Sequence, residues 1–441
     1  MKTVDGSLLR KPASCEVSAD RWARAILRGM FDAAVAAANP ALVLAPHLPP
    51  PPKGRCVVVG AGKAAASMAV AVEAAWPDVE LTGCVAVPYG YKAPCRRIRV
   101  REAGHPVPDA NSQQAAQDIL AAVAGLGPDD LVLALISGGG SACMSMPATG
   151  LSLEDKQATN RLLLASGLDI RTMNAVRQRI SAIKGGQLAA AAAPARVVTL
   201  AISDIPGDDA SAIASGPTVS VRGAGMDLGS IAKALGPGLP EKVRQVLSMP
   251  GKFQAVTNAE PVRTIATASD AMAAAAAVAR SHGIEPMVLG DDLEGEARSV
   301  AAGMASRVTS VSKPVVLLSG GETTVTVTCP KPGRGGRNTE FLLALTLALE
   351  GRAGVWALAA DTDGEDGANL GAAGALAAPD SLQRARAAGL DAQASLATHD
   401  SGSFFAALGD LVVTGPTLTN VNDFRAILIV PQDFDANSAG A

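Results

Sequence analysis

Aromatic side chains are scarce in this sequence. Only seven Phe, three Trp and two Tyr occur among 441 residues, so the chain offers little material for the platforms on which unpaired bases stack. It also lacks an excess of positive charge, because 38 Lys and Arg are balanced by 41 Asp and Glu, a formal charge of −3. We therefore expect no nucleic acid partner.

Metal-ligand and disulfide patterns are missing as well. The six cysteines form no C-x-x-C pair, and the four histidines have no metal-ligand spacing. We expect free cysteines that act as small hydrophobic residues. A zinc hydrolase is disfavoured, and so is a Ser-His-Asp hydrolase, because the sequence contains no G-x-S-x-G.

Long apolar runs are absent. No stretch of about 18 uncharged apolar residues occurs, and the first twenty residues are polar, without the apolar segment of a signal peptide. We expect a cytoplasmic protein with no membrane partner. A 48% share of apolar residues excludes a disordered chain, and the length predicts two or three domains.

Short β-rich runs alternate with Ala-rich helical stretches, a pattern typical of an α/β fold with parallel strands. After a helix at 21–38, strands are expected at 55–59, 83–87, 131–136 and 196–202. Beyond the Gly/Pro-rich stretch 221–261, a helix is expected at 271–280 and strands at 264–268, 285–289, 315–318, 325–328, 355–359 and 425–430. The sequence predicts two α/β domains with a cleft between them: residues 1–255, a doubly wound Rossmann-like parallel sheet, and residues 256–441.

A glycine turn follows the first predicted strand. Residues 57–69, VVVGAGKAAASMA, read as a strand, a tight turn and a helix, with Gly60, Gly62 and Lys63 at the junction. The turn is neither a dinucleotide fingerprint, because Ala65 replaces the third glycine, nor a P-loop. A lysine is unfavourable at a helix N-terminus, so Lys63 is predicted to bind an anion, with a solvated lysine as the alternative.

Two further glycine turns end strands. In ISGGGSA, residues 136–142, three glycines stand between Ser137 and Ser141 and predict a backbone nest for phosphate or carboxylate rather than a flexible turn. VVLLSGGETT, residues 315–324, repeats the Ser-Gly-Gly pattern with Gly320, Gly321 and Glu322.

A basic segment lies between these turns in the sequence. In NAVRQRISAIKGGQL, residues 174–188, the spacing places Arg177 and Lys184 on one helical face, which favours a solvated surface.

Acidic loops follow two other strands. Asp204 and Asp208 lie in 201–219, and Asp361 and Asp363 in AADTDGEDGA, residues 359–368, which lacks the glycine of a calcium loop. Carboxylates in such loops suit Mg²⁺, which takes one or two of them together with substrate phosphates. Asp-Gly turn chemistry is the alternative, and we expect a metal or general-base role for at least one acid.

A Gly/Arg loop precedes a helix at 333–349, GRGGRNTEFLLALTLAL. Arg337 can present a planar, permanently charged fork to a phosphate there. Asn338 is predicted as the N-cap of the helix, which would explain part of the motif structurally.

Taken in order, nine motifs resemble the bacterial glycerate 2-kinases with a MOFRL-type C-terminal domain, a class often labelled hydroxypyruvate reductase. They are GAGKAAASMA, GHPVPD, ISGGGSA, VRQRISAIKGG, SDIPGDDASAIASGPT, LSGGETTV, GRGGRNTEF, AADTDGEDG and TGPTLTNVNDFRAILI. Thr339, Arg179 and His399 depart from residues usual in the family (Gln, His and Asn), which bears on substrate detail rather than on the reaction.

The resemblance implies phosphorylation of D-glycerate to 2-phosphoglycerate with ATP and Mg²⁺, Lys63 and Arg337 coming from opposite domains. It places the family's functional lysine at Lys63, its arginine at Arg337 and its acids at Asp204 and at Asp361 or Asp363. Together with the motifs above, this gives three sets of predicted site residues: catalytic Lys63, Arg337 and Asp204; cofactor-binding Gly60, Gly62, Ser137, Gly138, Gly139, Gly140, Ser141, Lys184, Gly320, Gly321 and Glu322; and metal-binding Asp208, Asp361 and Asp363. The alternatives are an NAD(P)H-dependent hydroxypyruvate reductase and a non-catalytic sugar-phosphate sensor. A homodimer is left open.

Overall fold

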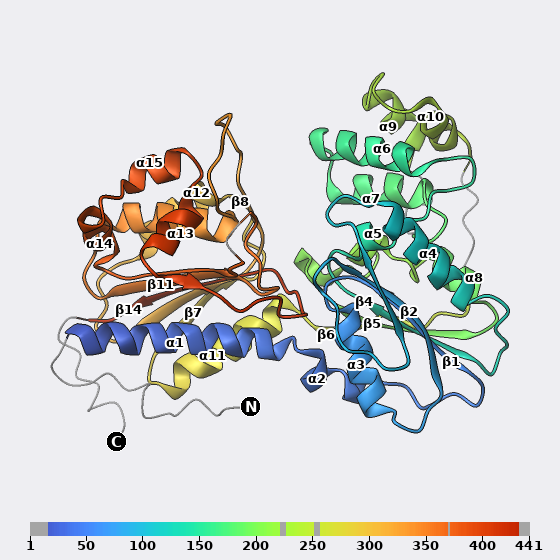
Figure 1. Cartoon of the computed structure of the whole chain (residues 1–441), viewed down its shortest axis with the longest axis horizontal. Coiled ribbons are helices and arrows are strands. Elements are labelled where there is room, and N and C mark those ends of the chain that lie inside the picture. Colours follow the sequence, from blue (N-terminus) through green and yellow to red (C-terminus); the bar gives the residue numbers. More distant parts are fainter. Residues whose placement is uncertain (1–15, 221–225, 251–255, 369–370, 432–441) are drawn as a thin grey trace. The chain divides into compact units, whose positions relative to one another are not determined.

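The computed structural model describes residues 16–220, 226–250, 256–368 and 371–431 (Figure 1). The chain divides into two compact units, each built around one six-stranded sheet. The first unit comprises residues 39–267 and 418–420, and the second comprises residues 1–38, 268–417 and 421–441. Among the described helices, none has both the length and the apolar character that crossing a membrane requires.

The sheet of the first unit is wholly parallel, with strand order β3-β2-β1-β4-β5-β6. Its strands are β1 (Cys56–Ala61), β2 (Leu81–Pro88), β3 (Arg99–Ala103), β4 (Leu131–Ile136), β5 (Arg196–Ile202) and β6 (Arg263–Ala266). This order confirms the predicted doubly wound, Rossmann-like sheet. The winding reverses between β1 and β4, so a ligand crevice is expected at the carboxyl ends of these two strands.

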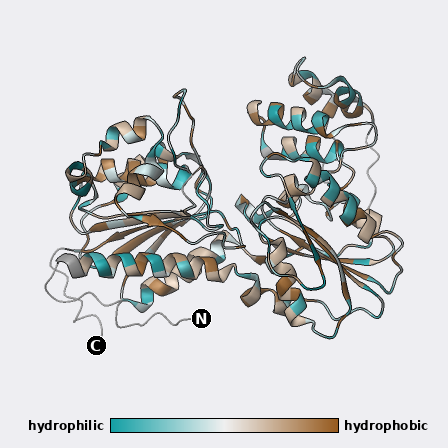
Figure 2. Ribbon diagram, in the orientation of Figure 1, coloured by the Kyte–Doolittle hydropathy of each residue, from teal (hydrophilic) through white to brown (hydrophobic). Residues whose placement is uncertain are grey.

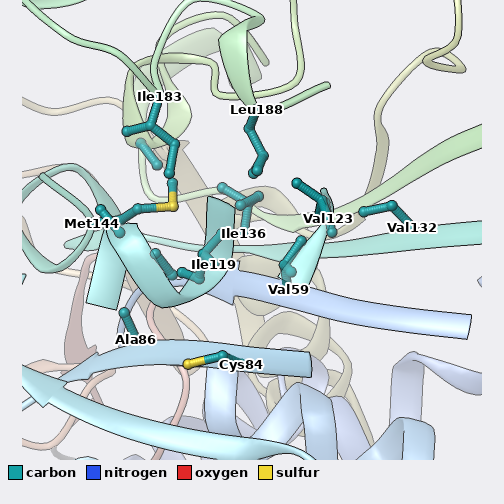
Figure 3. Close-up of a cluster of buried hydrophobic side chains, with 14 of the residues drawn as sticks. Val59, Cys84, Ala86, Ile119, Val123, Val132, Ile136, Met144, Ile183 and Leu188 are labelled. Carbon is teal, nitrogen blue, oxygen red and sulfur yellow. The ribbon is translucent and has the colours of Figure 1, made fainter. Parts of the chain in front are cut away.

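Helices cover both faces of this sheet. Helix α3 (Ala65–Ala75) packs on β1, β2 and β4, while α4 (Ala110–Ala122) and α8 (Gln187–Ala192) belong to the core cluster drawn in Figure 3. Alternate residues of the strands, such as Val57 and Val59, enter that core. Because both faces are covered, the central strands β1 and β4 are buried and apolar along their whole length and appear brown in Figure 2.

A separate group of helices follows β4 and has its own small core. Its members are α6 (Leu153–Ala165), α7 (Ile170–Arg179), α9 (Leu228–Ala234) and α10 (Glu241–Ser248). The shared helical face predicted for Arg177 and Lys184 is wrong. Helix α7 ends at Arg179, where the chain turns to form a β-bridge between Ser181 and Pro147. Gly185 and Gly186 then adopt left-handed φ angles of 62° and 82°, so no helix connects the two residues. Short turns complete this unit: α2 (Pro40–Val43), η2 (Ala45–His47), α5 (Gly140–Cys143), η3 (Pro206–Asp208) and η4 (Ile213–Ser215).

The second unit contains a mixed sheet of order β13-β12-β11-β14-β9-β7, in which only β7 and β9 run parallel. Its strands are β7 (Glu285–Gly290), β9 (Val315–Ser319), β11 (Val355–Asp361), β12 (Gly374–Ala377), β13 (Leu411–Val412) and β14 (Asp423–Ile429). The strand expected at 325–328 is wrong. Its Val327 is 54% exposed, so the alternating pattern buries no face, and the chain instead pairs β10 (Thr323–Thr324) with β8 (Gly295–Glu296).

Helices cover both faces of this sheet (Figure 1). They are α1 (Glu16–Ala37) and α11 (Ala268–Ser281), together with α12 (Ala297–Arg307), α13 (Arg337–Leu349), α14 (Ser381–Ala387), α15 (Ala392–Ala397) and α16 (Ser401–Ala407). The predicted division into 1–255 and 256–441 placed α1 with the first sheet. In the structure its Phe31 ring lies 5.8 Å from that of Phe424 in β14, so α1 packs on the second sheet. The predicted boundary at residue 255 lies outside the described residues.

The five cysteines in the described part of the chain are free, as predicted. Cys56, Cys84 and Cys143 are buried, while Cys95 and Cys329 are partly exposed. Cys15 lies outside the described residues.

The sheet itself explains one predicted ligand glycine. Gly60 lies inside buried β1, and a Cβ added there would stand 2.1 Å from the Leu135 carbonyl oxygen of β4.

We expect Gly60→Ala to lower the free energy of unfolding by about 1–3 kcal/mol, because the backbone must move to make room for the added methyl group. Gly303→Ala in α12 is the matched control. That position meets nothing within 4 Å, so the helix should be stabilised by about 0.5–1 kcal/mol. Urea denaturation of both variants measures this, and equal stabilities would contradict it.

Candidate active site

The loops that follow β1 and β4 are joined by two hydrogen bonds. The Lys63 backbone N–H donates to the Gly138 carbonyl oxygen at 2.8 Å, and the Ala64 N–H donates to Ser137 Oγ at 3.0 Å. Gly62 has a φ of 127°, and a Cβ there would lie 2.3 Å from Ser137 Oγ. The glycine is therefore required for the close approach, and Ser137 serves to hold the two loops together.

An aspartate and an asparagine close the other side of the glycine turn. A Cβ on Gly138 would lie 1.8 Å from Asp204 Oδ2 and 2.5 Å from Asn420 Nδ2. The Asn420 amide donates to the Asp204 carboxylate at 2.9 Å. Asp204 follows β5, whereas Asn420 belongs to a three-residue segment near the end of the chain that packs with the first unit. Asp204 was predicted at this site; Asn420 stood in a recognised motif, but the sequence assigned it no role.

The side chains of Lys63 and His105 flank the next glycine. A Cβ on Gly139 would lie 3.1 Å from His105 Nε2 and 3.6 Å from Lys63 Cγ. Desolvation and the positive charge of Lys63 together lower the pKa of His105 to about 4, although part of the ring reaches solvent. The imidazole is therefore neutral at pH 7, and Lys63 supplies the positive charge beside the turn.

Lys184 lies within the first unit rather than on its surface. It is only 3% exposed and its ammonium donates to the backbone and hydroxyl oxygens of Ser141. The solvated-face interpretation of Lys184 is therefore wrong. A Cβ on Gly140 would stand 2.6 Å from the Ala61 carbonyl oxygen, so this glycine too permits the loops to approach.

The structure brings Arg337 into contact with three carboxylates. Its Nε donates to Asp423 Oδ1 and its Nη2 to Asp361 Oδ2, both at 2.8 Å, and its Nη1 contacts Glu322. Burial alone would lower the pKa of Arg337, but the three carboxylates outweigh this and raise it. The arginine is thus a fully charged side chain held at the N-terminus of α13.

The start of α13 differs from its predicted form. The N-cap is Gly336 rather than Asn338, and the Asn338 amide donates to Asp423 at 2.7 Å. Buried Asp366 accepts from the backbone N–H groups of Asn338 and Thr339, each at 2.9 Å. Burial raises the pKa of Asp366 to about 6 against these hydrogen bonds, so it is ionised at pH 7. This carboxylate fixes the helix start that carries Arg337.

The other predicted residues of the second unit lie in the loops that follow β9 and β11. Gly320 and Gly321 follow β9, and a Cβ on Gly321 would stand 2.3 Å from the backbone of Leu293. Glu322 is 52% exposed at its side chain and pairs with Arg337. The Asp363 N–H donates to Asp361 Oδ1 at 3.0 Å, so both acids belong to the loop that ends β11.

No three His, Cys, Asp or Glu side chains come together as a metal site within the described residues. Asp208 lies partly exposed in the turn after β5, in the first unit, while Asp361 and Asp363 belong to the second. Mg²⁺ needs only one or two carboxylates when substrate phosphates supply the other oxygens. The oxygen donors of Asp361 and Asp363 fit such an ion chemically, and their metal role stays a prediction.

A family profile described as "Domain of unknown function (DUF4147)" matches residues 26–248, and the MOFRL family matches residues 315–423. A protein from Agrobacterium vitis that is provisionally named hydroxypyruvate reductase is 56% identical over 418 residues, which cover 93% of this chain and 95% of that protein.

Relatives from two thermophiles carry a kinase name. Glycerate 2-kinase of Pyrococcus horikoshii is 38% identical, with 86% of this chain and 88% of that protein covered. The crystal structure of a glycerate kinase from Thermotoga maritima superposes with a TM-score of 0.81 at 33% identity, covering 92% of this chain and 99% of that one. The chain therefore belongs to the glycerate kinase family with DUF4147 and MOFRL domains, as the resemblance of its motifs predicted.

Proposed function

We propose that this protein is a D-glycerate 2-kinase, which transfers the terminal phosphoryl group of ATP to the C2 hydroxyl of D-glycerate. The relatives named glycerate 2-kinase and glycerate kinase support the reaction class. One observation carries the proposal within this chain: Lys63 stands beside the Gly138–Gly140 turn, with Asp204 against that turn, where β1, β4 and β5 end.

The chemistry suits these groups. Phosphoryl transfer depends mainly on positioning and charge neutralisation. The C2 hydroxyl oxygen forms a bond to the terminal phosphorus as the bond to the ADP oxygen breaks, and ADP leaves with the electron pair. Asp204 accepts the hydroxyl proton, and the Lys63 ammonium neutralises charge on the migrating group. The glycine backbone lets phosphate oxygens approach closely.

Mg²⁺ and Arg337 complete the proposal. Asp361 and Asp363 would hold the ion, which supplies charge neutralisation at the nucleotide phosphates when bound. Arg337 is the second cation that we assign to the migrating phosphoryl group. It is the first residue of α13, where the carboxylates of Glu322, Asp361 and Asp423 hold its guanidinium in place. Arg337 and Lys63 belong to different units of the fold.

The alternatives make different assays positive. A hydroxypyruvate reductase would use a G-x-G-x-x-G turn for its nucleotide, whereas this chain has Ala65 at the third position and Lys63 in the turn. A sugar-phosphate sensor would bind a ligand without turnover. The first needs NAD(P)H and the second releases no ADP.

The proposed reaction predicts ADP release that depends on D-glycerate and Mg²⁺. A coupled assay for ADP measures it, and ³¹P NMR of the product should show phosphate on C2. Oxidation of NADPH with hydroxypyruvate, in the absence of ATP, is the parallel measurement. If NADPH is consumed and no ADP appears, the protein is a reductase; a C3 phosphate would overturn the assigned position.

Lys63→Ala should lower kcat by about 10²–10³-fold, because a charge that stabilises the transition state is lost. Lys53→Ala is the matched control, since Lys53 is exposed in the same unit. Thermal denaturation checks that both variants fold. A kcat within a few-fold of wild type in folded Lys63→Ala would remove this lysine from the mechanism.

Arg337→Met should affect stability and turnover together. The change removes the cation beside Asp361 and Asp423, which are 4% and 0% exposed, although Asp423 keeps its ion pair with Arg425. Unfolding should become easier by about 3–5 kcal/mol, mainly through Asp361.

The double variant Arg337→Met/Asp361→Asn removes one of the carboxylates that Arg337 paired with and should regain part of that stability. Because Asp361 is also a proposed Mg²⁺ ligand, Asp361→Asn alone measures how much ADP release the loss of that carboxylate costs. Assays at a temperature where each variant is folded separate the two effects. Recovery of turnover together with stability would mean that Arg337 acts only as a structural residue.

A further inference from the structure

A basic cavity lies beside the glycine turn of the first unit. Its volume is about 170 Å³, and its polar lining includes Lys156 from α6, Arg177 from α7, Lys184, His105, Ser141 and Asn160. None of the described residues that line it is acidic. We call this space the basic cavity. Three cationic side chains therefore face one small space that contains no carboxylate of the protein.

The cations have few hydrogen-bond acceptors around them. Within the described part of the chain, the Lys156 ammonium donates only to the Met146 carbonyl oxygen, at 3.3 Å, although it carries three N–H donors. The Arg177 guanidinium, with five N–H donors, donates to the side-chain oxygens of Asn160 and Asn174. Both side chains retain donors for a ligand oxygen, and neither forms an ion pair with a described carboxylate.

The lining is held in place by a chain of hydrogen bonds. Lys184 donates to Ser141, whose hydroxyl lies 3.0 Å from that of Ser215, and Ser215 donates to Asn174. Ser215 has a φ of 61°, a left-handed value that is uncommon for serine. The fold thus maintains a strained backbone that keeps this polar lining together.

Burial of uncompensated cations is unfavourable. Lys156 is 7% exposed, and desolvation lowers its pKa to about 7. The pKa of Lys184 is also lowered, by burial first and then by the charges of Lys156 and Arg177. An anion in the cavity would offset this cost, since it supplies both the negative charge and the missing acceptors.

The ligand must be small. Cavities for drug-sized molecules measure about 300–1,000 Å³, so a space of about 170 Å³ is too small for a nucleotide. A planar carboxylate matches the fork of Arg177 and the two ammonium groups. Gly139, beside which Lys63 passes, also lines the cavity, so an acid seated here has its remaining carbons next to the proposed phosphoryl site.

We propose that the basic cavity binds the carboxylate of the small hydroxy-acid substrate, with Lys156, Arg177 and Lys184 as its specificity-determining residues. This inference rests on the proposed kinase function and adds to it the part of the chain that recognises the acid.

The test compares Lys156→Met and Arg177→Met with Lys242→Met, an exposed lysine of α10 in the same unit. Each cavity variant should raise KM for D-glycerate roughly 10- to 100-fold, as expected for loss of a hydrogen bond from a charged group. KM for ATP should stay within about threefold, and Lys242→Met should match wild type. The preference for D-glycerate over its uncharged amide should fall in both cavity variants, because the cavity cations bind the carboxylate and not the amide.

A pH series separates charge from shape. The cations that line the cavity with Lys156 are Arg177 from α7 and Lys184 from the segment after it. His105, from the loop after β3, is titratable but neutral at pH 7 and above, and Glu241 on α10 pairs with Arg244 at the exposed side. Since the Lys156 ammonium loses its proton above about pH 7, D-glycerate should bind more weakly as the pH rises toward 9. Lys156→Arg keeps its charge throughout and should flatten this dependence.

The outcomes distinguish this inference from the function. If wild type releases ADP with D-glycerate but the cavity variants leave KM for the acid unchanged, or raise KM for ATP instead, the cavity assignment is overturned and the kinase stands. If no ADP is released, calorimetry with D-glycerate and with inorganic phosphate still tests the cavity. Binding of the acid that weakens in Lys156→Met and not in Lys242→Met supports it, while equal binding by all variants or a preference for phosphate overturns it.

Discussion

The pair of hydrogen bonds that joins the β1 and β4 loops determines the site of the first unit. Lys63 N–H to Gly138 and Ala64 N–H to Ser137 draw together two loops that leave adjacent parallel strands. At such a reversal of winding the loops would otherwise separate toward opposite faces of the sheet. The close approach requires glycines at 62 and 140, and it fixes where the Lys63 side chain can lie. Asp204 then meets the turn at Gly138, where no side chain intervenes.

The buried cations of the two units differ in whether carboxylates lie beside them. Arg337 is surrounded by Glu322, Asp361 and Asp423, which keep it charged and fixed. The cations of the basic cavity have no described acid beside them, and burial lowers the pKa of Lys156. The carboxylates offset part of the cost of burying Arg337 and hold its guanidinium in place, whereas a buried lysine without a carboxylate beside it gains most from an incoming anion. The first arrangement suits positioning, and the second suits recognition of a charged ligand.

Much of this architecture could be predicted from local sequence. The strands at 131–136 and 196–202 were found with their bounds because buried parallel strands are continuous apolar runs ended by turn residues. That Lys63, Gly138 and Asp204 lie together could be predicted because each follows such a strand by two residues. Strand β3, with the sequence RVREA at the sheet edge, carries charges and has no such run, and β12 is a four-residue GALA. The packing of α1 on the second sheet was missed, because an amphipathic pattern shows that one face of a helix is buried but not which sheet covers that face.

The basic cavity could not be predicted from a sequence motif, because its cations come from separate segments of the chain. Lys156 stands in LEDKQATNRLLLA, which reads as an ordinary surface helix, and the spacing of Arg177 and Lys184 suggested one solvated helical face. The helix ends between them, so the two side chains reach the same cavity from separate segments, and Lys156 arrives from a third. What makes them a recognition site is burial together with the lack of a neighbouring carboxylate. Both are properties of the folded chain. The sequence around a lysine is the same whether tertiary packing buries that lysine or leaves it in solvent.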